Sequence, residues 1–77
     1  MPHLAPVSTK KLLRLLKQEG FVCIRSKGSH NYFYNENDGR TTVIPIHANR
    51  DIGVGLLKSI LKDLNWSVEE FNKKLGR

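Results

Sequence analysis

The stretch "FVCIRSKGSHNYFYNENDGRTTVIPI", residues 21–46, decides the fold of this 77-residue chain. Three runs within it are rich in β-branched and aromatic residues, at residues 21–26, 30–35 and 40–46, and such runs favour strands. "KGS" separates the first two runs, and "ENDG" separates the last two with an Asp-Gly pair that is typical of hairpin turns. Pro45 stands near the end of the third run, where a missing N–H is tolerated. The stretch therefore predicts a three-stranded antiparallel meander.

An amphipathic helix is expected before the meander. Ser8 is a favoured N-cap residue, and Gly20 suits the position just after a helix end. Between them, leucines recur at helical spacing on one side of the predicted helix. The other side carries four basic residues, Lys10, Lys11, Arg14 and Lys17. The residues before Ser8, which include two prolines, are expected to form a short arm.

Two helices are expected after the meander. "HANRDIGVG" is interpreted as a loop, and apolar residues then recur at helical spacing over residues 56–64. Ser67 and Glu70 have the spacing of a capping box that opens a last short helix through Leu75. The order α-β-β-β-α with a helical tail predicts an α+β fold and a single domain over residues 1–77. In the economical two-layer solution, both main helices cover one face of the sheet.

Covering one face leaves the other face of the predicted sheet open. If Phe33 points toward the helices, period-two alternation sends His30, Tyr32 and Tyr34 to the open face. Aromatic residues on strands are more often part of a core, so at least one of the two tyrosines is expected to be buried. Cys23, in the first predicted strand, shows no activating neighbour and is expected to be a small buried residue.

The positive charge is concentrated in the first half of the chain. The net charge is +6, and residues 1–35 hold six Lys/Arg against the single acid Glu19, whereas residues 36–77 hold seven against six. A basic half favours a polyanionic partner, because each neutralised phosphate releases counterions. A solvated face that prevents aggregation explains the charge equally well. No apolar run approaches the ~20 residues that cross a bilayer, and the start lacks a signal core, so a cytoplasmic protein without membrane contact is expected.

His30 is the main candidate for chemistry. Histidine titrates near neutral pH, and Arg25 and Lys27 just before it would hold a phosphodiester within reach of its ring. Histidine and two cations are sufficient for one kind of RNA cleavage. A base removes the proton of a ribose 2′-hydroxyl, and cations offset the charge that grows on the attacked phosphate. The alternative is a polar residue that closes a hairpin. His47, at the end of the third predicted strand, is either a second proton-transfer group or a residue that caps the strand.

Other features give weaker signals. Three scattered histidines without a Cys/His/Asp cluster make a poor metal site, so no metal or cofactor is expected. Tyr32 or Tyr34 would stack unpaired bases if exposed. "GVG" at residues 53–55 would receive a phosphate at a helix start, although a loop-to-helix turn explains it as well.

Several motifs together resemble the HicA family of toxin–antitoxin modules, which are small mRNA interferases. They are "GF" at residues 20–21, "RSKGSH" at residues 25–30, "PIH" at residues 45–47 and "GLLKSILK" at residues 55–62. The resemblance extends over nearly all of residues 8–71. Lys58 departs from the arginine that the family often has there, and lysine lacks bidentate phosphate binding.

The resemblance implies a double-stranded-RNA-binding-like fold and a metal-independent endoribonuclease that acts on mRNA, with His30 as the essential catalytic residue. Arg25, Lys27 and Ser29 match the same motif and are expected to contact RNA together with the four basic residues of the first helix. The resemblance also implies a HicB-like antitoxin that covers the His30 site. We expect the free toxin to be a monomer.

Two other functions fit the same residues. A non-catalytic RNA- or DNA-binding module would use the basic face without needing His30. A protein-interaction domain would use the charge to match an acidic partner. A steep loss of RNA binding with salt separates the nucleic-acid-binding functions from the last one.

Overall fold

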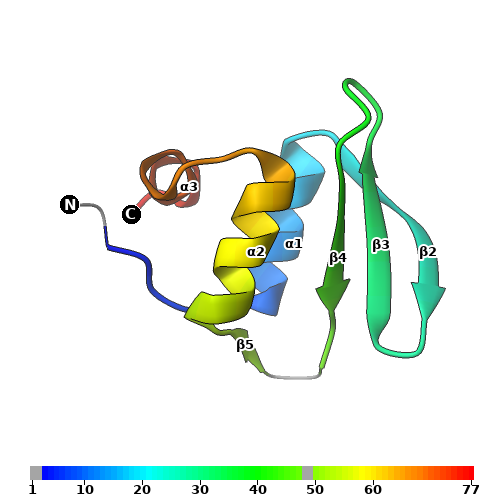
Figure 1. Cartoon of the computed structure of the whole chain (residues 1–77), viewed down its shortest axis with the longest axis horizontal. Coiled ribbons are helices and arrows are strands. Elements are labelled where there is room, and N and C mark those ends of the chain that lie inside the picture. The colour runs from blue at the N-terminus through cyan, green and yellow to red at the C-terminus, as the bar shows by residue number, and fades with distance from the viewer. Residues whose placement is uncertain (1–2, 48–49) are drawn as a thin grey trace.

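The computed structural model describes residues 3–47 and 50–77. Its elements are β1 (Val7–Ser8), α1 (Thr9–Gln18), β2 (Phe21–Lys27), β3 (His30–Asn35), β4 (Thr41–Pro45), β5 (Asp51–Ile52), α2 (Val54–Leu64) and α3 (Val68–Leu75). The antiparallel sheet has the order β2-β3-β4, with α1 against β2 and α2 against β4. The two helices lie between the sheet and α3 (Figure 1). This arrangement confirms the predicted α+β, double-stranded-RNA-binding-like fold. No helix within the described residues has both the length and the apolar character to span a membrane.

Apolar side chains of the sheet and the helices form one core. Phe21, Phe33 and Ile44, one from each strand of the sheet, are buried. The helices contribute Leu12, Leu15 and Leu16 from α1 and Leu57, Ile60, Leu61 and Leu64 from α2. Removing apolar surface from water at about 25 cal/mol per Å² is the main stabilisation available to such a core. The apolar patterns in the sequence therefore mark the buried faces of both helices, except that Leu56, at the start of the second pattern, is 40% exposed.

Polar side chains determine where α1 begins and ends. The Ser8 hydroxyl accepts a hydrogen bond from a backbone N–H in the first turn at 3.1 Å, which confirms the predicted N-cap. The buried Asn35 amide donates to the Glu19 carbonyl at 3.0 Å and accepts from the Asn37 N–H at 2.8 Å. Asn35 thereby ties the end of α1 to the turn between β3 and β4.

A second small sheet differs from the predicted arm and loop. β1 pairs with β5, with Val7 opposite Ile52, and both side chains are buried. Beside this pair, the Thr9 hydroxyl donates to the Arg50 carbonyl at 2.8 Å. Strands of two residues are too short to leave a period-two pattern, so the sequence could not indicate them. Residues 48–49 of the predicted loop, and the first two residues of the arm, lie outside the described residues.

Aromatic residues hold α3 against the rest of the fold. Phe71 is fully buried, and Trp66 packs edge-on against Phe21 with ring centroids 6.5 Å apart. Ser67 and Glu70 form the predicted capping box. Hydrogen bonds from the backbone and side chain of Ser67 hold the pKa of Glu70 below its ordinary value.

Polar contacts also join α3 to the beginning of the chain. The Asn72 amide donates to the His3 carbonyl at 3.0 Å, and the Arg77 guanidinium donates to the Pro6 carbonyl at 2.8 Å. The two ends of the described chain therefore lie side by side (Figure 1).

Cys23 is exposed, so the prediction of a buried cysteine is wrong. Its side chain lies on the helix side of β2, because Cys23 pairs with the buried Phe33. However, β2 is an edge strand, and α1 leaves a hollow of about 300 Å³ beside it. This β2 hollow is lined by Leu13, Lys17, Phe21, Val22, Cys23 and Phe33. A strand pattern indicates which side a residue faces, but not whether a helix covers that side.

Candidate functional site

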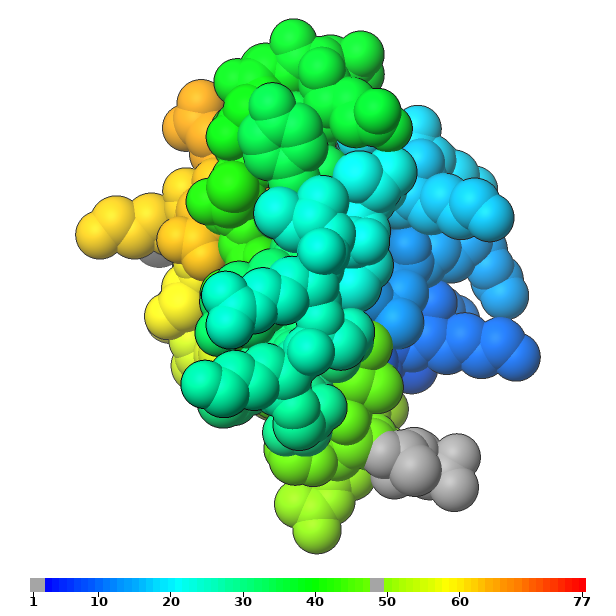
Figure 2. All heavy atoms as spheres, turned by 90° about the vertical axis from the view of Figure 1, so that its right-hand side faces the viewer, coloured from blue at the N-terminus to red at the C-terminus, as the bar shows by residue number. Residues whose placement is uncertain are grey.

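The side of the sheet away from the helices, here called the open face, carries three rows of side chains. The strand register sets these rows as Lys27, His30 and Pro45; Arg25, Tyr32 and Val43; and Val22, Tyr34 and Thr41. Seen from the strand side, the strands occupy the middle of the molecule, with α1 at one flank and α2 at the other (Figure 2). In this view no described helix lies in front of the strands (Figure 2).

Both tyrosines of β3 lie on the open face. Tyr34 is 37% exposed and Tyr32 is half-buried, so the expectation that at least one of them joins the core is wrong. Each is a direct neighbour of the buried Phe33, and alternation along a strand prevents neighbours from sharing a face. Strand alternation, as predicted, places both tyrosines on the open face and outweighs the general preference of aromatic residues for cores.

A β-bulge turns two cations toward the open face. The register along β2 shifts at Ile24, which is the extra residue and is 61% exposed. In a regular strand, alternation would have turned Arg25 and Lys27 toward the helices. With the bulge, Lys27 lies opposite His30, and the Arg25 guanidinium lies 5.7 Å from the centre of the Tyr32 ring. Bulges commonly redirect side chains beside functional sites. No sequence pattern indicates the bulge at Ile24.

Hydrogen bonds hold the turn that precedes His30. The Ser29 carbonyl accepts from the Ile46 N–H at 2.7 Å and from the Asn31 side-chain amide at 2.9 Å. The Ser26 hydroxyl donates to the Asn31 side-chain oxygen at 2.7 Å. Asn31 therefore bridges the two strands of the hairpin on the helix side of His30. Sequence reasoning missed Asn31, although a polar residue on the inward side of a strand indicates that it has hydrogen-bond partners.

Replacing Asn31 by alanine is expected to lower the free energy of unfolding by about 1–2 kcal/mol, because two hydrogen bonds of the hairpin are lost. Urea denaturation followed by circular dichroism measures this change. Asn37→Ala is a matched control, since the exposed Asn37 contributes only its backbone N–H to the bonds of the β3–β4 turn. The control should change stability by less than about 0.5 kcal/mol. Equal losses in the two variants would contradict the bridging role of Asn31.

His47 lies beside the same turn. The hydrogen bond between Ile46 and Ser29 continues the strand pairing beyond Pro45, and His47 follows directly and is exposed. The end of β4 and the β2–β3 turn are at the same end of the sheet (Figure 1). The structure therefore brings the segment that carries His47 to the end of the sheet where His30 lies.

The four basic residues of α1 are not on the open face. α1 belongs to the helix layer, and its side chains extend at the flank of the strands (Figure 2). Lys17 borders the β2 hollow, whereas Lys11 and Arg14 border a different hollow between α1 and α3. All four are exposed, namely Lys10, Lys11, Arg14 and Lys17. The fold thus groups Arg25 and Lys27 with His30 but keeps the basic side of α1 separate.

Most acidic side chains have individual partners. Glu19 pairs with Lys74, Asp38 with Arg40 and Glu69 with Lys73, while Asp63 accepts a hydrogen bond from Thr42 and Glu70 caps α3. Hydrogen bonds from the Arg40 side chain and backbone hold the pKa of Asp38 below its ordinary value. Among the residues that the structure describes, no three His, Cys, Asp or Glu side chains converge as metal ligands.

Comparison with known proteins identifies the family. The family model described as "HicA toxin of bacterial toxin-antitoxin" matches residues 9–66, which include α1, the three-stranded sheet and α2. A probable mRNA interferase HicA of Pseudomonas fluorescens (strain Pf0-1) is 43% identical over 51 residues, which cover 66% of this chain and 82% of that relative. The chain therefore belongs to the HicA toxin family of bacterial toxin–antitoxin systems.

Proposed function

We propose that this toxin is a metal-independent endoribonuclease that cleaves mRNA in the cytoplasm, with His30 as its general acid or base. The observation that carries the proposal is the placement of an exposed histidine between Lys27 and the end of β4, on a face that no described helix covers. The name of the Pseudomonas relative, an mRNA interferase, supports the same activity.

The chemistry needs only the groups at this end of the sheet. His30 takes the proton of a ribose 2′-hydroxyl, and the 2′-oxygen forms a bond to the adjacent phosphorus. The bond from phosphorus to the 5′-oxygen breaks, and that oxygen receives a proton from a second group, for which His47 is the candidate. The products are a 2′,3′-cyclic phosphate and a 5′-hydroxyl. Lys27 and Arg25 offset the charge that develops on the phosphate, which is the kind of stabilisation that contributes most in such reactions.

The acidic residues support a mechanism without metal ions. Two-metal hydrolysis needs several carboxylates that converge on ions about 3.5–4 Å apart. In this chain Glu19 follows α1, Asp38 lies in the turn between β3 and β4, and Asp63 lies in α2. Each of the three is bound to a different partner. A histidine, two cations and the 2′-hydroxyl of the substrate are sufficient for the proposed cleavage without a metal ion.

The rest of the open face suits single-stranded RNA and a protein inhibitor. Tyr32 and Tyr34 follow His30 along one strand and offer rings to unpaired bases, each such contact being worth about 1–3 kcal/mol. Val22, Tyr34 and Val43 form an exposed apolar surface there, each between 37% and 39% exposed. Exposed apolar groups of this kind favour a macromolecular partner. A HicB-like antitoxin that covers the His30 site of a monomeric toxin is the partner we propose.

Removing the two cations of the open face is expected to weaken RNA binding and to flatten its salt dependence. The double variant Arg25→Ala/Lys27→Ala should lower the slope of log K against log salt by about 0.7 for each lost phosphate contact on a single strand. Fluorescence anisotropy with a labelled RNA between about 50 and 200 mM salt measures this slope. An unchanged slope would mean that these cations do not contact phosphate.

A simple gel assay distinguishes the proposed ribonuclease from a protein that only binds nucleic acid. A non-catalytic RNA- or DNA-binding module shifts an mRNA in a native gel but leaves it intact in a denaturing gel. We expect the purified protein to fragment mRNA and to leave DNA of the same sequence whole. Intact mRNA after binding would favour the alternative.

A further inference from the structure

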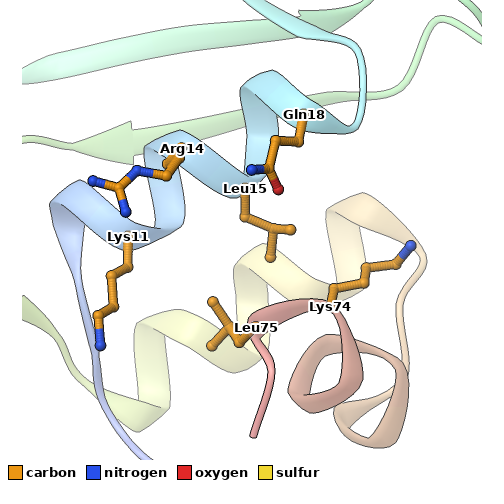
Figure 3. A pocket seen from close by; sticks show the side chains of 6 residues that line it. All are labelled: Lys11, Arg14, Leu15, Gln18, Lys74 and Leu75. Atoms are coloured by element: carbon orange, nitrogen blue, oxygen red, sulfur yellow. The ribbon is translucent and has the colours of Figure 1, made fainter.

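A hollow with a basic lining lies between α1 and α3. The wall that α3 contributes lies beyond the residues that match the family model. The match ends at residue 66, whereas α3 begins at Val68. The α1–α3 hollow measures about 220 Å³ and is lined by Lys11, Arg14, Leu15 and Gln18 from α1 and by Lys74 and Leu75 from α3 (Figure 3). Leu15 and Leu75 point toward one another and form its apolar wall.

The charges around this hollow favour an anion. Among the described residues, Lys11 and Arg14 take part in no ion pair. The nearby carboxylate of Glu19 is already bound by Lys74 at 2.5 Å, and the Lys74 ammonium also lies 5.1 Å from the centre of the Trp66 ring. Lys74 points away from the hollow in Figure 3. Two cations and the Gln18 amide are therefore left to receive a negatively charged group.

The size and position of the α1–α3 hollow restrict which negatively charged group it can hold. Its 220 Å³ is less than the 300–1,000 Å³ of typical small-molecule sites, so a phosphate with one sugar fits better than a larger ligand. An arginine offers a planar pair of donors that matches phosphate geometry. Because α3 lies across the helices from the sheet, a group in this hollow cannot be the phosphate that His30 attacks (Figure 1).

Cations connect the two sites around one side of the molecule. Lys27 and Arg25 lie on the open face, Lys17 borders the β2 hollow, and Arg14 and Lys11 border the α1–α3 hollow. A series of cations that continues from one site to the other suits a charged polymer more than it suits a folded acidic protein. The molecule is 35 Å in its longest dimension, which about ten nucleotides span even at the rise of about 3.4 Å each that a stacked strand has.

We propose that the α1–α3 hollow holds a backbone phosphate of the RNA strand, several nucleotides away from the bond that is cleaved. The proposal rests on the proposed function, because it takes RNA as the substrate. Its consequence is that long RNA binds through both sites, whereas an RNA too short to reach α3 binds through the open face alone. Lys11 and Arg14 then contribute to affinity for long substrates and not to the chemical step.

The test compares the variant Lys11→Ala/Arg14→Ala with a control of equal charge, Lys62→Ala/Lys73→Ala. Lys62 and Lys73 are exposed and lie outside both hollows. All proteins carry His30→Ala so that the RNA stays intact, and binding of labelled RNAs of about 5 and about 20 nucleotides is followed by fluorescence anisotropy. We expect the Lys11/Arg14 variant to bind the long RNA about tenfold more weakly, as loss of one charge-assisted hydrogen bond does. Its affinity for the short RNA should equal that of the control.

The outcomes separate this proposal from the proposed function. If the parent protein binds neither RNA, the proposed function fails. If the parent binds the long RNA and the Lys11/Arg14 variant binds it equally well, only the α1–α3 site fails. The α1–α3 site would also be overturned if the control variant weakened RNA binding equally, or if binding of both RNA lengths were weakened equally. In either case the loss of net positive charge would explain the weaker binding. Circular dichroism melting of each variant shows that the fold is retained, since both changes are at exposed helix positions.

Discussion

Replacing His30 by alanine is expected to reduce RNA cleavage by about 10²–10⁴-fold, the range that a positioned acid or base contributes. Toxicity in cells should disappear with it. His30 is exposed, and none of the hydrogen bonds that hold its hairpin comes from its side chain. Stability should therefore stay within about 0.5 kcal/mol of the parent protein, as is usual for surface substitutions.

His3→Ala is the matched control for this variant. His3 is also exposed, and only its backbone carbonyl takes part in the contact with α3, so its side chain should be dispensable. Cleavage of a labelled mRNA is measured for both variants beside thermal melting. A folded His30 variant that cleaves as fast as the parent would remove His30 from the mechanism. An unfolded variant would contradict the expectation that the His30 side chain is dispensable for the fold, and its lost activity would then have a structural cause.

A single 2′-deoxy substitution at the cleaved nucleotide is expected to block the cut completely. The attacking group in the proposed mechanism is the 2′-oxygen of the substrate, so no other nucleophile takes its place when that oxygen is missing. The remaining phosphate contacts are unchanged, and binding of the substituted RNA should stay within about twofold, which is less than 0.5 kcal/mol. Gel analysis of cleavage and anisotropy measurements of binding test the two statements separately.

The same substitution placed three or four nucleotides away from the cut is the control, and it should leave cleavage unchanged. A water-activating mechanism predicts the opposite for the first substrate, because water attacks a deoxyribose phosphate as well as a ribose phosphate. Cleavage of the RNA that is deoxy at the cut would therefore exclude the 2′-oxygen as the nucleophile.

The sequence was sufficient for the sheet and the two main helices because their signals are long and regular. Phe33 and the strand period placed His30 and both tyrosines on the open face, and the leucine patterns identified the buried sides of α1 and α2. Ser8 marked the start of α1 through its hydroxyl. In each case a repeated or directional local preference agrees with the tertiary packing.

The features that shape the candidate site depend on contacts between distant residues. The shift of register at Ile24 directs Arg25 and Lys27 to the open face. No glycine or turn residue beside Ile24 indicates this shift in the sequence. The role of Asn31 depends on Ser26 across the hairpin. The exposure of Cys23 depends on how far α1 extends over an edge strand. Local sequence patterns contain none of this information.

The proposed metal-independent cleavage by His30 is tested by one experiment in EDTA that also identifies the ends of the products. The parent protein and its His30→Ala variant are incubated with the same mRNA, and the 3′ ends of the fragments are analysed by mass spectrometry. We expect fragments from the parent protein that end in 2′,3′-cyclic phosphate, and intact mRNA with the variant. Loss of parent activity in EDTA, or fragments that end in a 3′-hydroxyl with a 5′-phosphate on the other side, would contradict it.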